Sequence, residues 1–232
     1  MPNSALIWSP SAERVSNSNL LRFIEKVNKD KAEGTVINNY TSLHQWSIEH
    51  NDEFWRHTWQ FCNVIGDMGS QIKSLGSPKW TLTGSNHHVN RDTVWFADAT
   101  LNYAENLLSQ AGQSPEREFI VFSNESGEHR QLTGKQLLEQ VSAIQQWLLN
   151  CGVGKGDVVA GYLPYLPETV IAMLATTSLG AIWTSTSPDF GIDSVVERFG
   201  QVKPKVLFCC DGYQFGGKAF DMTDKNTTLS SK

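Results

Sequence analysis

Residues 152–191 read GVGKGDVVAGYLPYLPETVIAMLATTSLGAIWTSTSPDFG and contain two short apolar runs with a helical pattern between them. The first run, Val158–Leu163, is typical of a buried strand. Pro167 suits the first position of the following helix, and Gly180 supplies the backbone freedom that ends it. The second run, Ala181–Thr184, predicts another strand. This order predicts a strand–helix–strand unit, in which a right-handed crossover makes the two strands parallel.

The same alternation continues on both sides of this unit. Upstream, Phe119–Phe122 predicts a strand, and Thr133–Gln136 has the pattern of a capping box that opens a helix. Downstream, Ile192–Phe199 predicts a short helix ended by Gly200, and Lys205–Cys209 predicts a further strand. Strands that alternate with helices indicate an α/β fold with a mainly parallel sheet and crossover helices. Four strands are few for an enzyme of this class, so we expect a partial sheet.

The sequence before this part is rich in tryptophan and less regular. Ser18 predicts the N-cap of one helix, Asn51 that of a second, and Ala97–Leu108 predicts a third. The chain therefore divides into a mostly helical, irregular N-terminal region over residues 1–112 and an α/β region over 113–220. Residues 221–232 are almost entirely polar and predict a frayed tail, because little in them could be buried.

Composition excludes several classes of function. The net charge is −5 and the pI is about 5.7, and no run of basic residues offers the patch that nucleic acids or anionic membranes require. The most apolar stretch, Leu166–Trp183, contains Pro167, Glu168 and Gly180, so we predict no membrane span. The N-terminus lacks the pattern of a secretion signal, and the four cysteines show no CxxC spacing, which favours a cytoplasmic protein with reduced thiols.

The first candidate binding segment is Ser185–Gly191, which follows a predicted strand and precedes a predicted helix. Ligands of open α/β sheets bind beyond the carboxyl ends of the strands, and hydroxyls with free amides at a helix start hold anions. The structural alternative is a simple turn in which Asp189 caps the helix and Gly191 supplies backbone freedom. The residues alone favour this alternative.

The second candidate is Gly212–Lys218, with the sequence GYQFGGK. It fits the glycine and lysine positions of a phosphate-binding loop, but Ala219 stands where that loop needs a hydroxyl for Mg²⁺. The glycines could still bring backbone amides close to a phosphate, with Lys218 as a point charge. A glycine-rich turn with a solvated lysine is an equally good interpretation.

A pair of histidines, His87 and His88, is the remaining feature of note. No carboxylate or cysteine accompanies the pair at a spacing typical of metal sites, so we predict solvated side chains and no metal ligands. The sequence also lacks a nucleophile elbow and a dinucleotide-binding fingerprint.

Several stretches, in this order and spacing, resemble the acetyl- and acetoacetyl-CoA synthetases of the adenylate-forming acyl-CoA synthetase superfamily. The matching stretches are Trp95–Phe96, Leu101–Leu108, Gly152–Pro164, Pro167–Glu168, Ser178–Trp183 and Ser187–Gly191. Three more resemble the acetoacetate-specific branch: Arg198–Gln201, Pro204–Phe208 and Asp211–Lys218. The resemblance extends over nearly the whole chain to about Asp221 and corresponds to the N-terminal portion of the family.

The resemblance implies an AMP-forming acid–thiol ligase. ATP and acetoacetate would form acetoacetyl-AMP and diphosphate, and the thiol of coenzyme A (CoA) would then displace AMP, with Mg²⁺ offsetting charge on the phosphates. It places Ser187, Pro188 and Asp189 near the nucleotide end of CoA, and likewise Gly216, Gly217 and Lys218. The acetate enzymes carry two arginines in this second segment. Here Phe215 and Lys218 stand at the matching positions, so a bidentate phosphate contact is lost.

The family's later motifs are absent from this sequence, and no catalytic residue can be assigned in it. They are the Ser/Thr/Gly-rich phosphate loop, the Tyr-x-x-Thr-Glu segment, the ribose-binding aspartate, the hinge and the late catalytic lysine. We therefore expect a chain that is inactive alone and that works, if at all, with a separate C-terminal remainder. Alternatives are a fragment like the acetyl- or propionyl-CoA synthetases, and a non-catalytic module for CoA, nucleotide or protein binding.

Overall fold

A computed structural model describes residues 7–31, 36–75 and 93–230. The chain divides into two compact units, Met1–Leu101 and Asn102–Lys232, and each is described by itself. The sequence predicted a boundary at residue 112 instead. The boundary between the units lies earlier in the chain because the helix that begins at Tyr103 packs with the second unit, where Ala104 is fully buried in the main core. No helix among the described residues is long and apolar enough to cross a membrane.

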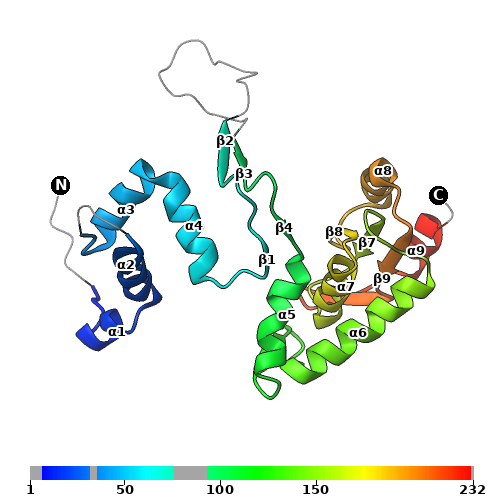
Figure 1. Cartoon of the computed structure of the whole chain (residues 1–232). Coiled ribbons are helices and arrows are strands. Elements are labelled where there is room, and N and C mark those ends of the chain that lie inside the picture. Colours follow the sequence, from blue (N-terminus) through cyan, green and yellow to red (C-terminus); the bar gives the residue numbers. More distant parts are fainter. Residues whose placement is uncertain (1–6, 32–35, 76–92, 231–232) are drawn as a thin grey trace, which may run out of the picture. The chain divides into compact units, whose positions relative to one another are not determined.

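The described residues of the first unit form four helices and two short two-stranded ladders, which can be followed in Figure 1. The helices are α1 (Ala12–Ser16), α2 (Asn19–Asp30), α3 (Tyr40–Glu49) and α4 (Asn51–Phe61). The ladders pair β1 (Gly66–Asp67) with β4 (Thr100–Leu101) and β2 (Lys73–Leu75) with β3 (Thr93–Trp95), both antiparallel. Its core contains Phe23, Ile24, Val27, Ile37, Leu43 and Trp46.

Local capping explains where these helices begin. Ser18 accepts a hydrogen bond from the amide of Leu21, which confirms the predicted N-cap. Helix α3 was not predicted; Asn39 and Ser42 open it with a reciprocal capping box. Asn51 is the first helical residue of α4 and not its cap. In the second ladder region, the Asp98 carboxylate accepts hydrogen bonds from Ser70 and Gln71, which lower the pKa of Asp98 to about 2.

The second unit is an α/β structure built on a three-stranded parallel sheet. The sheet has the order β8-β7-β9, with β7 (Val158–Tyr162) between β8 (Ile182–Thr186) and β9 (Val206–Cys209). Five helices accompany it within residues 102–230: α5 (Tyr103–Gln113), α6 (Gly134–Asn150), α7 (Pro167–Ser178), α8 (Ile192–Val202) and α9 (Thr223–Ser230). Two hairpins complete the unit, β5 (Glu118–Ser123) with β6 (His129–Thr133) and β10 (Gly212–Phe215) with β11 (Lys218–Asp221).

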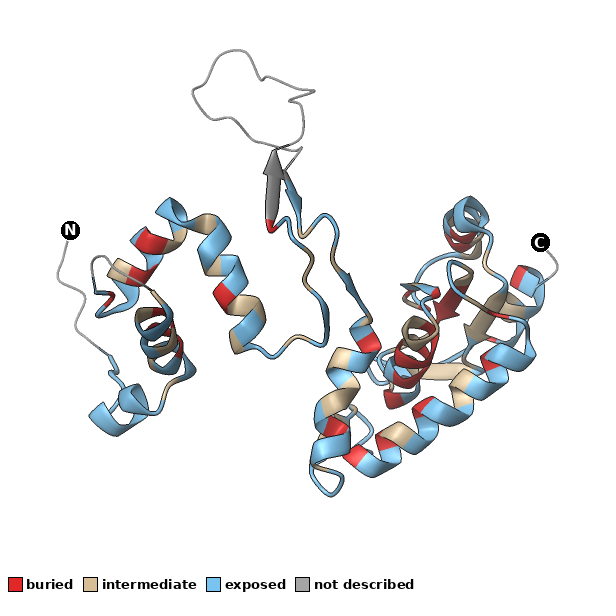
Figure 2. Ribbon diagram, in the orientation of Figure 1, coloured by how far each residue is buried: buried red, intermediate tan, exposed pale blue. Residues whose placement is uncertain are grey.

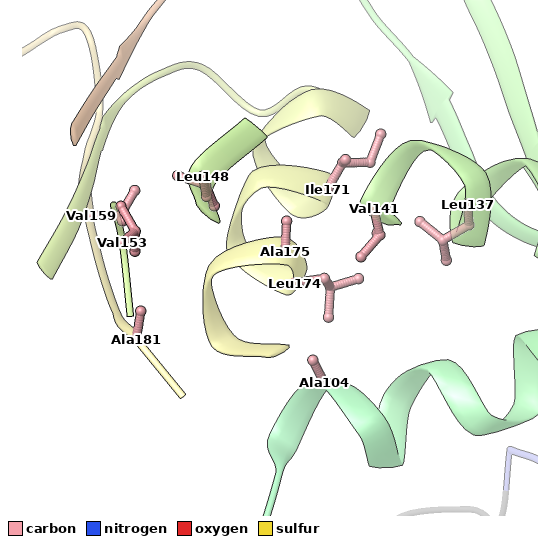
Figure 3. Packing of buried hydrophobic residues seen from close by; sticks show 10 residues of the cluster. All are labelled: Ala104, Leu137, Val141, Leu148, Val153, Val159, Ile171, Leu174, Ala175 and Ala181. Atoms are coloured by element: carbon pink, nitrogen blue, oxygen red, sulfur yellow. The ribbon is translucent and has the colours of Figure 1, made fainter. Parts of the chain in front are cut away.

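Both faces of the parallel sheet are covered, as is usual for parallel strands. On one face Val159 joins a cluster from α5, α6 and α7; Figure 3 shows its ten buried members, and Figure 2 shows how the buried positions recur along these helices. On the other face Ala160 and Tyr162 pack with α8 and α9. Gly161 returns to the first face, where a Cβ would lie 2.7 Å from the Trp183 ring, so the indole needs this glycine.

The start and end signals of the central helices are confirmed. Thr133 and Gln136 form the reciprocal capping box of α6, and Pro167 is the first residue of α7. Gly180, with φ of +69°, follows the end of α7. The predicted helix over Ala97–Leu108 instead begins after Asn102, whose side chain caps α5 and also donates to two carbonyls at the end of α7.

Three predictions in this unit are wrong. The strand predicted at Phe119–Phe122 is present as part of β5, but it pairs antiparallel with β6 and lies outside the parallel sheet, which therefore has three described strands and not four. Helix α8 continues past Gly200 to Val202, and its C-cap Lys203 adopts a left-handed conformation. Residues 223–230 form α9 instead of a frayed tail, because the few apolar side chains at Met222 and Leu229 are both buried against α8 and β7.

Candidate functional site

A pocket of about 420 Å³ lies at the carboxyl ends of β7 and β8, where an open α/β sheet binds its ligands. Two chain segments that follow these strands line it, Pro164–Leu166 and Ser187–Asp189. The other wall comes from the two hairpins, through residues between Phe122 and Glu128 and through Gly212–Phe215. The pocket is thus assembled from four segments that are distant in sequence.

The segment after β8 is tied down by its own aspartate. Ser187 Oγ donates to Asp189 Oδ2 at 2.8 Å, and the Tyr213 hydroxyl donates to Asp189 Oδ1 at 2.8 Å. These bonds, that of Ser187 first, lower the pKa of Asp189, while burial and then the Asp189 contact raise the pKa of Tyr213 to about 12. Asp189 is therefore an anion whose two oxygens already have donors. It does not cap α8, whose N-cap is Gly191 without a side-chain bond.

The buried side chain of Tyr162 also holds the segment after β8 in place. Its side chain is fully buried, and its hydroxyl lies 2.7 Å from the Phe190 carbonyl oxygen and 3.1 Å from that of Pro188. Burial raises the pKa of Tyr162, so the hydroxyl stays protonated and able to donate. Lys225 of α9 also reaches the Pro188 carbonyl, at 3.4 Å, which places a cation beside the loop.

The GYQFGGK segment is a hairpin and not a phosphate loop. Phe215 pairs with Lys218, which leaves Gly216 and Gly217 as a two-residue turn, and a strand follows where a phosphate loop would continue as a helix. The amides of Gly216 and Gly217 donate to the two carboxylate oxygens of Glu125, at 3.0 and 2.9 Å. Lys218 is exposed, and neither it nor the two glycines belong to the pocket lining.

The structure therefore separates the predicted site residues into two groups. Ser187, Pro188 and Asp189 line the pocket, together with Phe215 from the second segment. Gly216, Gly217 and Lys218 lie at the turn of the hairpin that forms one wall. Pro188 is fully buried and contributes mainly through its carbonyl.

No described group of three or more His, Cys, Asp or Glu side chains could hold a metal ion. His87 and His88 lie outside the described residues. The four cysteines are free thiols.

Sequence reasoning missed four residues of this site: Glu125, Tyr162, Tyr213 and Lys225. Tyr213 lay inside the candidate GYQFGGK segment, but nothing in its spacing pointed to Asp189. Tyr162 was assigned only to a strand, although a tyrosine at the end of a buried strand needs a partner for its hydroxyl. Glu125 and Lys225 carried no local signal, since their partners lie 91 and 37 residues away.

Comparison with known proteins adds the family. A sequence profile for AMP-binding enzymes matches residues 107–231, which is more than half of the chain. The chain belongs to the AMP-binding enzyme family. The matched part of this AMP-binding enzyme chain contains the whole pocket lining and every residue of the Glu125 contact.

Several similar proteins carry a more specific name than that of the family. The chain is 38% identical over 219 residues to an acetoacetyl-coenzyme A synthetase from Rhizobium meliloti, covering 94% of this chain and 31% of that protein. It is 33% identical over 223 residues to an acetoacetyl-CoA synthetase from Danio rerio, covering 96% and 31%. The structure of an acetoacetyl-CoA synthetase from Streptomyces lividans matches with a TM-score of 0.82 and 34% identity, covering 97% of this chain and 33% of that chain. This chain spans about a third of the length of these relatives.

Proposed function

We propose that this chain is the N-terminal portion of an acetoacetate–CoA ligase and that its pocket receives the nucleotide end of CoA. The overall reaction converts ATP, acetoacetate and CoA into acetoacetyl-CoA, AMP and diphosphate. The observation that carries the proposal is the similarity to acetoacetyl-CoA synthetases over 94% or more of the chain, with the pocket inside the family match.

The pocket has features that suit a nucleotide. Its position beyond β7 and β8 is the usual ligand position of such sheets. Two aromatic side chains at its lining, Tyr165 and Phe215, are 96% and 65% exposed and offer flat apolar faces to a base. Ser187 and Lys225 add a hydroxyl and a cation next to the buried Pro188. Asp189 limits where a phosphate could lie, because its ionised carboxylate repels one.

The chemical step would depend on groups beyond this chain. Adenylation gives the carboxylate of acetoacetate a good leaving group, and charge on the phosphates must be neutralised as it forms. The described residues contain no group of three or more His, Cys, Asp or Glu side chains that could hold Mg²⁺. We therefore propose that the chain binds CoA but does not release AMP from ATP without a C-terminal remainder.

Two measurements on the purified chain test this proposal. Titration calorimetry should detect CoA binding that weakens as salt is added, because phosphate contacts are screened. AMP release in the presence of ATP and CoA should stay at the level of a no-protein control with acetoacetate, acetate or propionate. Absence of CoA binding would contradict the proposal that the pocket receives the nucleotide end of CoA. Release that depends on acetoacetate would show that the chain holds a complete nucleotide site, and release with acetate or propionate would favour those branches.

A substitution at Lys218 tests whether this residue contributes to CoA binding. If the phosphates of CoA lie at the GYQFGGK hairpin, Lys218→Ala weakens CoA binding several-fold, by loss of one point charge. Lys135→Ala, which removes an exposed lysine at the start of α6, is the matched control and leaves binding unchanged. Equal affinity in the two variants would take Lys218 out of the site.

A further inference from the structure

The Gly216–Gly217 turn has the geometry of an anion-binding site. Both residues have positive φ, +60° and +72°, as the two central positions of a type I′ hairpin turn require. Their successive amides point to one place and donate to both oxygens of one carboxylate, that of Glu125. Backbone amides that converge in a turn of this kind hold anions in many proteins. A Cβ at either glycine would meet nothing within 4 Å, so close packing does not require a glycine at these two positions.

Glu125 is held in place by its own hairpin. It lies in the turn between β5 and β6, where the Asn124 side-chain oxygen accepts from the amides of Ser126 and Glu128 and from the Ser126 hydroxyl. Gly127, with φ of +82°, completes the turn. The Glu125 carboxylate is thus presented to the second hairpin by a well-bonded loop. In the described part of the chain no lysine or arginine forms an ion pair with it.

We propose that Glu125 occupies an anion-binding turn from within the chain, and that a phosphate-bearing ligand of the pocket binds Gly216 and Gly217 by displacing the Glu125 carboxylate. This inference rests on the proposed function, because it concerns the same ligand at the turn of the hairpin that forms one wall of the pocket. Each amide has one proton, so two amides cannot serve the carboxylate and a phosphate at once. A phosphate monoester carries a charge of about −1.5 to −2 at neutral pH and would be repelled by an adjacent Glu125 that stayed in place.

Displacement also changes the pocket wall. The hairpins that Glu125 joins, β5–β6 and β10–β11, both line the pocket. Releasing the carboxylate frees the two turn tips from one another, so ligand entry and hairpin separation are coupled. Glu125 is therefore a residue that sets the affinity for phosphate monoesters, and ligands without a phosphate gain nothing when it is removed.

The experiment compares Glu125→Gln and Glu125→Ala with Glu139→Gln, an equal change of charge at an exposed position of α6. Titration calorimetry with CoA and with adenosine 3′,5′-bisphosphate measures affinity, and NMR follows the amide signals of Gly216 and Gly217. We expect both Glu125 variants to bind roughly three- to tenfold more tightly than the natural chain, as for loss of a competing charged hydrogen bond. The two glycine amides should exchange faster in the variants before ligand is added, and their signals should shift on binding.

The outcomes separate this inference from the proposed function. If the natural chain binds CoA and the Glu125 variants bind it no more tightly than the Glu139→Gln control, displacement is overturned and the proposed function stands. If only the Glu125 variants bind CoA, the result supports displacement. It contradicts the proposal that the natural chain binds CoA. If no variant binds either ligand, or if ligand leaves the Gly216 and Gly217 signals unmoved, displacement is overturned. Unchanged signals elsewhere in the spectrum show that each variant remains folded.

Discussion

The Tyr162→Phe substitution tests whether the loop after β8 is held by one buried hydroxyl. Tyr162 is fully buried at the end of β7, and its hydroxyl is within hydrogen-bond distance of the carbonyls of Phe190 and Pro188, at 2.7 and 3.1 Å. The hydroxyl has one proton, so it donates to one carbonyl at a time. Lys225 also reaches the Pro188 carbonyl, and the closer Phe190 contact is therefore the one we expect the variant to lose.

The expected cost follows from the hydrogen bond and not from packing. Phenylalanine keeps the ring, so the apolar contacts of the Ala160–Tyr162 face with α8 and α9 are retained. Removing one partner of a buried hydrogen bond costs about 1–3 kcal/mol. Phe190 is exposed, so water can partly replace the lost donor, and we expect a loss of about 1–2 kcal/mol in the free energy of unfolding.

Urea denaturation measures this loss as a lower midpoint with an unchanged slope. The matched control is Tyr165→Phe, which removes a hydroxyl from another tyrosine of the same pocket lining whose side chain is 96% exposed. That variant should stay within about 0.5 kcal/mol of the natural chain. Equal stability of the two variants would refute the role given to the Tyr162 hydroxyl. If Tyr162 also positions the pocket, its variant binds CoA more weakly as well.

Three further predictions concern other parts of the chain. Leu148→Ala, which opens a cavity at a fully buried position, should lower the free energy of unfolding by about 2–5 kcal/mol, and Leu149→Ala, at a 46% exposed neighbour, by much less; chemical denaturation compares them. Asp189→Asn should lower the pKa of Tyr213 from about 12, because the anion that opposes tyrosinate is gone, although burial remains; a pH titration of tyrosinate absorbance that shows no shift would contradict this. Hydrogen bonding lowers the pKa of Asp98 to about 2, so its ionised form stabilises the fold above its unfolded pKa, near 3.8, and this contribution is lost as the pH falls toward 2. Asp98→Asn should be less stable at neutral pH, and the difference should shrink between pH 4 and 2 in thermal melts.

Signals that act over a few residues allowed much of the fold to be predicted. The Ser18 cap, the Thr133–Gln136 capping box and Pro167 at a first helical position each concern bonds or geometry within one turn of helix. The strand–helix–strand order around Val158–Leu163 then determined that the strands run parallel. Such local interactions can be predicted from the sequence because the interacting residues are close together in the chain.

Partner choice between distant segments could not be read in this way. The run at Phe119–Phe122 has the composition of a buried strand, yet its partner is His129–Thr133, and a hairpin satisfies its backbone as well as a place in the parallel sheet would. Residues 221–232 contain too few apolar residues for a periodic pattern. The two in this segment, Met222 and Leu229, are nevertheless buried, and the Asn226 side chain donates to the Cys210 carbonyl. Polar composition predicted exposure correctly for most side chains there but not the helix itself.

The candidate site shows the same limit in a form that bears on function. The residues carried over by resemblance, Ser187–Asp189 and Gly216–Lys218, were chosen for hydroxyls, amides and positive charge that a phosphate could use. In the folded chain the hydroxyl and the amides already have partners within the protein: Ser187 donates to Asp189, which also accepts from Tyr213, and the two glycine amides donate to Glu125. A phosphate therefore competes with internal acceptors instead of filling vacant donors, and its affinity is the difference between two sets of hydrogen bonds. Sequence motifs name the donors of such a site, but the competing carboxylate, 91 residues away, is found only in the fold.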